Sequence, residues 1–369
     1  MGDRSLKIAL FAPDLAGGGA ERILAHLANG MAARGCAVDV VLLDVVGVYL
    51  AELSPEVRVV DLRSRRTATG VWPLVRYLRR AQPDVVLSAH AHSSIATLLA
   101  KRLARVASCI VPTVQTSHTK AAEHCRGLRD RLVRASLGWS HSWADAIVAC
   151  SNGVADDFVQ VTGLPRDRVR VIYNPIVTPQ LKELAKQPVD HPWFAPGQPE
   201  VVLGVGRFSA PKDFPTVVNA FALLRKKRNL RLAILGEGAE RSSLERLVAD
   251  LGLTQDVSLP GFAQNPFGYL AKAAVFVFSS LWEGLPTALV EALALGVPIV
   301  ATDCDCGPRE ILQGGRYGRL VPVGDVEAMA QALEETLSQP RPEVPEEYVR
   351  QFTLDAVVDK YLQLFAEIR

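Results

Sequence analysis

Short, continuously apolar runs alternate with longer amphipathic stretches along almost the whole chain. Twelve of these runs have the length of a β-strand, at residues 7–12, 37–43, 57–62, 84–89, 109–114, 145–150, 169–174, 200–206, 230–236, 256–261, 274–280 and 298–302. Apolar side chains at successive positions require both faces of a strand to be covered, as in a parallel sheet between two layers of helices. The pattern therefore predicts an α/β fold.

The stretches between the runs have helical periodicity, as in AERILAHLANGMAARG and PTVVNAFALLRKK. Several end at a glycine, such as Gly35, Gly252 or Gly296, and glycine readily takes the left-handed conformation that closes a helix. Strands and helices that alternate in this way predict doubly wound, Rossmann-like sheets. Such sheets bind ligands beyond the carboxyl ends of their strands, so those ends are the first place to look for functional residues.

One segment interrupts the alternation. Residues 178–199 contain five prolines and no apolar run, and 369 residues are too many for one ordinary core. We therefore expect a first domain over 1–177, a linker over 178–199 and a second domain over 200–345. An amphipathic helix over 346–369 is expected to pack back toward the first domain.

The charge is nearly balanced, with a net charge of +2, and we expect no nucleic-acid partner. The first apolar run is short for a secretion signal, and no run reaches the roughly 18 apolar residues of a membrane span. Six cysteines at irregular spacing fit a reducing compartment. We expect a cytoplasmic protein whose contact with a membrane is at most peripheral.

Three glycines follow the first strand, in APDLAGGGAERIL. The backbone amides around Gly18 and Gly19, with the start of a helix behind them, could bind an anion. The alternative is a tight turn in which Glu21 complements the helix dipole. The residues leave both interpretations open.

The first strand of the second domain ends in GVGRFSAPKDF. Gly204 and Gly206 permit a close approach of the backbone, and Arg207 and Lys212 follow. One cation that can bind in a bidentate way and one point charge suit a diphosphate. The alternative is a pair of solvated surface cations, which their place at a strand end disfavours.

Two glutamates lie in the stretch WEGLPTALVE, just past the strand at 274–280. Pro286 suits a first helical turn, and the free amides near Leu285 and Thr287 could bind an anion. Glu283 and Glu291 could then accept hydrogen bonds from sugar hydroxyls near that anion and farther along the helix. The alternative is that Glu283 caps the helix and that Glu291 is an exposed filler.

The strand at 256–261 ends in SLPGFAQN. Phe262 could stack on a nucleobase, or it could belong to an ordinary turn.

Two spacings resemble metal sites. Asp303 and Asp305 are separated by one residue, and so are His90 and His92. Neither pair has a further carboxylate ligand close in sequence, so we expect that the chain binds no metal and needs no cofactor.

These motifs extend along nearly the whole chain, and their order resembles that of the motifs in the retaining glycosyltransferases of family 4. The resemblance implies the GT-B fold, in which two Rossmann-like domains face each other across a cleft, and a nucleotide-sugar as donor. It rests on GGGAE, a histidine in VQTSHT, YNP, VGRFSAPKD, LPGF and EGLPTALVE.

The resemblance also assigns roles. Arg207 and Lys212 would neutralise the donor's diphosphate, Glu283 would bind the sugar hydroxyls and Glu291 the ribose. His118 would lie near the reacting carbon. Arg207, Lys212, Glu283 and His118 are thus the expected catalytic residues.

Gly18 and Gly19 would close over the phosphates or the sugar, and His124 is a second candidate for the histidine role. The expected donor-binding residues are Gly18, Gly19, Gly206, Phe262, Gly284, Leu285, Pro286, Thr287 and Glu291.

The resemblance implies a metal-independent transfer of the sugar to a hydroxyl acceptor, with retention of configuration. A uridine diphosphate sugar is the favoured donor. The product would be a bacterial surface glycan or a lipid-linked saccharide. Residues 61–134 contain fourteen Lys or Arg against four Asp or Glu. The basic stretches 74–82 and 126–139 could lie on an anionic membrane surface or be solvated helix faces.

Two other functions share this architecture. A nucleotide-sugar 2-epimerase would need no acceptor, and a catalytically silent scaffold subunit would keep the fold without turnover. Incubation with the donor alone separates the first from a transferase, and calorimetry of nucleotide binding separates the second.

Overall fold

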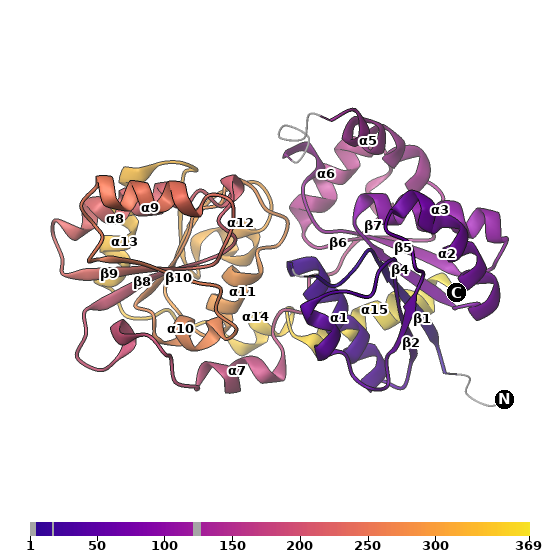
Figure 1. Cartoon of the computed structure of the whole chain (residues 1–369), viewed down its shortest axis with the longest axis horizontal. Coiled ribbons are helices and arrows are strands. Elements are labelled where there is room, and N and C mark those ends of the chain that lie inside the picture. The colour runs from indigo at the N-terminus through magenta and orange to yellow at the C-terminus, as the bar shows by residue number, and fades with distance from the viewer. Residues whose placement is uncertain (1–4, 17, 121–126) are drawn as a thin grey trace. The chain divides into compact units, whose positions relative to one another are not determined.

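A computed structural model describes residues 5–16, 18–120 and 127–369 (Figure 1). The chain forms two compact units. Unit 1 consists of Met1–Pro175 together with Phe352–Arg369, and unit 2 consists of Ile176–Gln351. The chain therefore passes from one unit to the other twice.

Unit 1 contains a parallel sheet with the strand order β3-β2-β1-β4-β5-β6-β7. The strands are β1 (Lys7–Ala12), β2 (Ala37–Leu42), β3 (Arg58–Asp61), β4 (Val85–Ala89), β5 (Cys109–Val114), β6 (Ile147–Ala149) and β7 (Val169–Val171). The helices are α1 (Gly19–Ala33), α2 (Thr67–Ala81), α3 (Ala91–Ala104), α5 (Leu128–His141), α6 (Asn152–Thr162) and α15 (Leu354–Ile368).

Helices α1 and α15 cover one face of this sheet, and their close contact depends on a glycine. A Cβ atom at Gly30 in α1 would lie 2.7 Å from a methyl group of Val358 in α15, so only a glycine leaves the room. Tyr361 and Phe365 of α15 are buried in the same core as the strands. The last helix of the chain thus completes the core of unit 1.

Unit 2 contains a parallel sheet with the order β10-β9-β8-β11-β12-β13. Its strands are β8 (Glu200–Val205), β9 (Leu230–Leu235), β10 (Val257–Gly261), β11 (Val275–Phe278), β12 (Ile299–Thr302) and β13 (Arg319–Val321). Its helices are α7 (Pro179–Ala185), α8 (Phe214–Arg225), α9 (Arg241–Asp250), α10 (Pro266–Lys272), α11 (Thr287–Ala294), α12 (Pro308–Ile311), α13 (Val326–Leu337) and α14 (Glu346–Arg350). Buried side chains of α8, α9 and α13 form the core with one face of the sheet.

The two Rossmann-like α/β sheets confirm the fold class, and each of the twelve apolar runs contains a strand. The structure corrects the prediction that residues 178–199 form a linker between domains. This segment belongs to unit 2, where α7 packs against α10 and Asn265 donates a hydrogen bond to the carbonyl of Leu184 at 2.9 Å. Its prolines start helical turns, as Pro179 does in α7, rather than keeping the segment extended.

The single helix predicted over residues 346–369 is divided between the two units. Helix α14 belongs to unit 2 and α15 to unit 1, with the division after Gln351. The helix that packs on the first unit therefore begins at Leu354. Among the described residues, no helix combines the length and the apolar character that crossing a membrane requires.

Candidate functional site

The turn that follows β8 is built for close packing. The amide of Gly206 donates to the carbonyl of Leu235 at 3.0 Å, and a Cβ atom at Gly206 would lie 3.3 Å from the ring of Phe214. Gly236, at φ +150°, lies so near that a Cβ atom there would overlap the carbonyl oxygen of Gly206. Glycines at these positions let two strand ends meet with backbone exposed between them.

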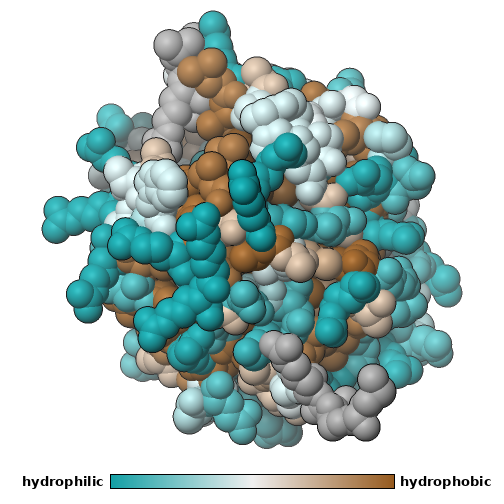
Figure 2. All heavy atoms as spheres, turned by 90° about the vertical axis from the view of Figure 1, so that its right-hand side faces the viewer, coloured by the Kyte–Doolittle hydropathy of each residue, from teal (hydrophilic) through white to brown (hydrophobic). Residues whose placement is uncertain are grey.

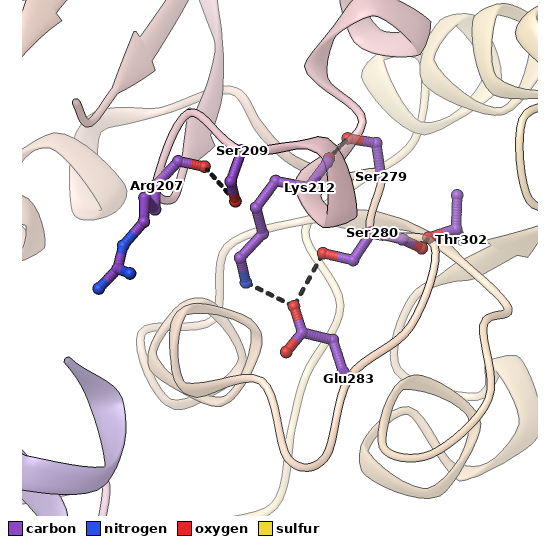
Figure 3. Close-up of polar contacts among 7 residues, drawn as sticks. All are labelled: Arg207, Ser209, Lys212, Ser279, Ser280, Glu283 and Thr302. Carbon is purple, nitrogen blue, oxygen red and sulfur yellow. Dashed lines mark hydrogen bonds and ion pairs between the residues drawn. The ribbon is translucent and has the colours of Figure 1, made fainter. Parts of the chain in front are cut away.

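Beyond this turn, the predicted Lys212 and Glu283 meet (Figure 3). The Nζ atom of Lys212 donates to Oε1 of Glu283 at 2.5 Å, and the hydroxyl of Ser280 donates to the same oxygen at 2.8 Å. The side chain of Lys212 is 27% exposed and that of Glu283 is 16% exposed. The pair is therefore half-buried but open to a ligand.

Neighbouring hydroxyls fix the backbone on both sides of this pair. Ser279 donates to the carbonyl of Lys212 at 2.6 Å, and Thr302 in β12 donates to the carbonyl of Ser280 at 2.7 Å (Figure 3). These serines and Thr302 were not predicted as site residues. Ser279 and Thr302 bond to backbone carbonyls that are distant in sequence, and Ser280 stands at the end of the apolar run 274–280.

Asp213 turns the chain from Lys212 into α8. It has a φ of +46°, and its carboxylate accepts from the hydroxyl of Thr216 at 2.6 Å. Burial raises the pKa of Asp213, and the hydrogen bond from Thr216 opposes that rise. Lys212 thus projects from a turn that is held at both of its ends.

The loop of Glu283 packs against a second loop of the same unit. The amide of Glu283 donates to the carbonyl of Asp305 at 3.4 Å, and a Cβ atom at Gly307 would lie 2.5 Å from Cδ of Pro286. Burial raises the pKa of Cys304 to about 12, with the Glu283 carboxylate as the next largest cause. Cys304 is therefore a neutral thiol beneath the loop.

The sequence suggested that Pro286 is part of the first turn of a helix. Helix α11 instead begins at Thr287, and Pro286 is its N-cap. A proline side chain cannot accept a hydrogen bond, so it does not cap the amides of the first turn. Glu291 is only 2% exposed, with the buried Val290 and Ala292 beside it. This excludes the interpretation of Glu291 as an exposed filler.

Arg207 and Phe262 are both exposed. Arg207 lies on the same turn as Lys212, and its carbonyl accepts from the hydroxyl of Ser209 at 3.4 Å (Figure 3). Phe262 follows β10 and is 76% exposed. An exposed aromatic ring at a strand end leaves the predicted stacking role possible in steric terms.

In unit 1, Gly18 immediately precedes α1, and the carboxylate of Glu21 folds back over it. Glu21 also lies 3.3 Å from Nε2 of His90. The rings of His90 and His92 stack with their centroids 5.9 Å apart. Gly19 is the first residue of α1, so the predicted loop does lead into a helix N-terminus.

His118 follows β5 in a loop that α6 holds in place. The amides of His118 and Thr119 donate to the carboxylate of Asp157 at 2.6 and 3.3 Å. The imidazole of His118 lies 5.7 Å from the ring of Phe158, and burial lowers its pKa against the opposing charge of Asp157. His124, the second candidate, lies outside the described residues.

In the part of the chain that the structure describes, no three His, Cys, Asp or Glu side chains are grouped to hold a metal ion. The carboxylate of Asp303 instead accepts from Nε of Arg309 at 3.1 Å. His90 pairs with Glu21 and stacks on His92, as described above.

Two family models match the chain. The model described as "Glycosyltransferase Family 4" covers residues 17–179, and the one described as "Glycosyl transferases group 1" covers residues 187–352. The first range contains β2 to β7 of the first sheet, and the second contains all six strands of the second sheet.

Relatives with given functions are also similar to the chain. The lipopolysaccharide core biosynthesis glycosyltransferase LpsE of Rhizobium meliloti is 31% identical over 95% of this chain and 96% of its own length. The N-acetylgalactosamine-N,N'-diacetylbacillosaminyl-diphospho-undecaprenol 4-alpha-N-acetylgalactosaminyltransferase of Campylobacter jejuni is 33% identical over 53% of this chain and 51% of its own length. The chain also matches the uncharacterized glycosyltransferase MJ1059 of Methanocaldococcus jannaschii, over 61% of the length of that relative.

Among solved structures, Anabaena Alr3699/HepE in complex with UDP-glucose superposes with a TM-score of 0.80 and 18% identity, over 98% of this chain and 100% of that one. At this identity the likeness shows a shared fold.

Proposed function

Because the chain belongs to the glycosyltransferases of group 1 and family 4 and has their GT-B fold of two Rossmann-like domains, we propose that it transfers a sugar from a nucleoside diphosphate to a hydroxyl acceptor. The observation that supports this most directly is the group formed by Lys212, Glu283 and Ser280. A cation and a carboxylate are presented together there, between the ends of β8 and β11 and before α11.

The pairing of Lys212 with Glu283 suggests how the donor binds. A diphosphate would compete with Glu283 for the ammonium group of Lys212, and Arg207 on the same turn would share its charge. Glu283 would then accept hydrogen bonds from the hydroxyls of the sugar. The amides at the start of α11, with Gly284 and Leu285 before it, would add positive potential.

The remaining assignments extend from this centre. Glu291 is proposed to hold the ribose, Phe262 to stack on the base, and Gly18 and Gly19 to approach the phosphates. The neutral imidazole of His118 is proposed to meet the donor sugar. His118 and Phe262 follow β5 and β10, Gly18 and Gly19 lie at the junction that leads from β1 into α1, and Glu291 lies inside α11, the helix that follows β11.

The chemistry requires charge stabilisation more than covalent help. The nucleoside diphosphate leaves as negative charge develops on it, and fixed cations and amides lower the free energy of that transition state. We propose retention by attack on the face that the diphosphate leaves, with the departing phosphate accepting the proton of the acceptor hydroxyl.

The relatives suggest the substrate class. LpsE acts in lipopolysaccharide core biosynthesis, and the Campylobacter enzyme is named for a diphospho-undecaprenol acceptor. The structural neighbour from Anabaena was solved with UDP-glucose. We therefore propose a uridine diphosphate sugar as donor and a bacterial surface glycan or its lipid-linked precursor as acceptor.

The test of the proposed function is calorimetry of UDP and UDP-glucose binding, with transfer measured on lipid extracts by mass spectrometry. Replacing Lys212 with alanine should weaken both ligands and lower turnover by about 10²-fold or more, as expected when a charge-stabilising group is lost. Lys227→Ala is the control, because Lys227 pairs with Glu334 on the surface at 2.7 Å. Equal behaviour of the two variants would refute the diphosphate assignment.

Incubation with the donor alone tests for an epimerase, and calorimetry of nucleotide binding tests for a scaffold. An epimerised nucleotide-sugar would indicate an epimerase, and lack of nucleotide binding by the folded protein would indicate a scaffold.

We also propose that transfer is independent of metal ions, since Arg207, Lys212 and the amides of α11 can supply the charge that the phosphates need. Activity should persist in excess chelator. Loss of activity in chelator with recovery on adding Mg²⁺ or Mn²⁺ would instead implicate Asp303 and Asp305.

A further inference from the structure

His118 is the first residue of a helical turn, and the amides of the first three residues of this turn all have a partner. Residues 118–120 are helical. The amide of Lys120 donates to the hydroxyl of Ser117 at 3.3 Å, which is an ordinary local cap. The amides of His118 and Thr119 donate instead to the carboxylate of Asp157, at 2.6 and 3.3 Å. A residue that is 39 positions away in the sequence therefore serves as a second cap.

Helix α6 gives Asp157 a fixed position. The start of α6 is itself capped by Ser151, whose hydroxyl accepts from the amide of Val154 at 3.2 Å. Phe158, the residue after Asp157, is fully buried, and its ring lies 5.7 Å from the imidazole of His118. Asp157 thus holds the backbone of His118 while Phe158 contacts its ring. Two successive residues of α6 fix both the place and the orientation of the imidazole.

Asp157 differs from an ordinary surface carboxylate. On the face of unit 1 that carries α2 and α3, long hydrophilic side chains project into solvent around hydrophobic patches (Figure 2). The adjacent Asp156 is likewise exposed, and it pairs with Arg166 at 2.8 Å. Asp157 is only partly exposed, and each of its two oxygens accepts from a backbone amide. The two neighbouring aspartates therefore have different roles.

The charge of Asp157 also acts on the imidazole that it holds. Burial lowers the pKa of His118, the Asp157 carboxylate opposes this effect, and Arg134 of α5 adds to it. His141 of α5 contacts the same Phe158 ring, and burial lowers its own pKa to about 4, so it is neutral near pH 7. Of the three titratable groups around His118, only Asp157 is an anion.

We propose that Asp157 is a positioning residue, whose carboxylate fixes the place of His118 for its contact with the donor sugar. This rests on the proposed function, in which His118 meets that sugar. A carboxylate suits the role because the start of a helix attracts negative charge, and because its two oxygens can accept from two amides at once. Asparagine in its place would keep one acceptor oxygen but not the charge, and alanine would keep neither. The two substitutions therefore separate hydrogen bonding from charge.

Hydrogen exchange measured by mass spectrometry tests the hydrogen bonds without any donor present. In Asp157→Ala, the amides of His118 and Thr119 should exchange about tenfold faster or more, because their acceptor is lost. Asp157→Asn should keep much of the protection. Asp156→Ala is the matched control, since it removes the adjacent exposed carboxylate and should leave the exchange of these two amides unchanged.

Titration of the histidine rings by NMR tests the effect of the charge. The His118 signal is identified by its absence in His118→Gln. It should titrate at lower pH in Asp157→Asn and in Asp157→Ala than in the unchanged protein, because the negative charge that favours the protonated ring is gone. Asp156→Ala should shift the titration less, since its carboxylate is exposed and screened.

Kinetics connect the position of His118 to the reaction. Asp157→Ala should lower kcat by about tenfold or more, as expected when a reacting group is misplaced. The Kd of UDP should stay the same, because UDP lacks the sugar that His118 is proposed to meet. Asp157→Asn should recover much of the lost turnover. Circular dichroism and thermal unfolding establish that each variant is folded, so that the split between kcat and Kd is not a loss of stability.

Three results would overturn the proposal. One is equal protection of the two amides in Asp157→Ala and in the unchanged protein. A second is an unchanged titration of His118 in Asp157→Asn, which also decides the matter if Asp157→Ala does not fold. A third is a loss of kcat in Asp156→Ala as large as that in Asp157→Ala. Failure of the unchanged protein to bind UDP would instead refute the proposed function, and it would leave the exchange and titration results standing.

Discussion

Glu283 and Glu291 lie in the same short stretch but in very different surroundings. Glu283 is in a loop, where Lys212 and Ser280 bind its carboxylate. Glu291 is inside α11 and is 2% exposed. Lys212 and Ser280 thus offset the cost of burying the Glu283 carboxylate, and a carboxylate as buried as that of Glu291 is costly unless it is hydrogen-bonded or paired.

The proposed roles of these two glutamates can be separated by two ligands. Glu283→Gln should weaken UDP-glucose but not UDP, because UDP has no sugar to lose and its diphosphate no longer competes with a carboxylate for Lys212. Glu291→Gln should weaken both ligands alike, because both carry the ribose. Loss of a hydrogen bond to a charged group is worth about 1.5–3 kcal/mol, which calorimetry resolves.

Glu334→Gln serves as the control for this pair, because Glu334 pairs with Lys227 on the surface. If both site variants fold and bind both ligands like the unchanged protein, the glutamates do not contact the donor.

At the scale of helices and strands, most of the fold follows from the sequence. Continuous apolar runs mark buried parallel strands, and only β13 was missed in the described part of the chain. Its three residues, Arg319–Val321, follow two glycine-containing turns, and the apolar run that begins at Leu320 is short and interrupted by Pro322. Helix α7 was missed because the five prolines of residues 178–199, of which Pro179 starts the helix, were interpreted as marks of a linker.

The candidate site was predicted less completely than the fold. Glycines and charged residues at strand ends were recognised, and the structure does bring Lys212 to Glu283. Ser280, three residues before Glu283, was taken only as the end of the apolar run 274–280. Thr302 and Asp157 were not recognised, because each acts on a residue that is distant in sequence. Such partners become apparent only when the strand order is known.

Helix α5 should make the stability of unit 1 depend on pH. His141 is buried beside Phe158, and burial lowers its pKa from the ordinary 6.5 to about 4. Because the pKa of His141 is lower in the folded state, the neutral imidazole contributes fully to the stability of unit 1 above pH 6.5. This contribution is lost as the pH falls toward 4. The loss amounts to about 3 kcal/mol of unfolding free energy.

Denaturant unfolding at several pH values measures this loss. Carboxylates also titrate in the lower part of the range. The informative comparison is therefore how steeply the unfolding free energy falls with pH in the unchanged protein and in His141→Gln. The variant should lose less stability between neutral pH and about pH 5. Parallel curves for the two proteins would contradict the assignment to His141.

At the scale of the whole molecule, the chain contributes its last helix to its first unit. Val357, Val358, Tyr361 and Phe365 of α15 are all buried against α1 and the sheet. Arg34, the residue that follows α1, also pairs with Asp355 at 2.8 Å. Unit 2, in contrast, is one continuous segment.

A chain that ends at Gln351 should therefore keep unit 2 folded and lose the stability of unit 1. Limited proteolysis with mass spectrometry should show rapid cleavage within residues 1–175 and protection of residues 176–351. Deletion of Arg369 alone is the control and should leave both units protected. Protection of both units in the longer truncation would show that α15 is dispensable for the core.

This arrangement has a consequence for biosynthesis. A ribosome releases residues 1–175 first, yet the apolar groove that receives Tyr361 and Phe365 stays unfilled until the final helix emerges. Unit 2 can therefore complete its fold while the earlier segment still waits. During that interval the uncovered apolar side chains are a binding surface for chaperones and a site at which neighbouring nascent chains can aggregate.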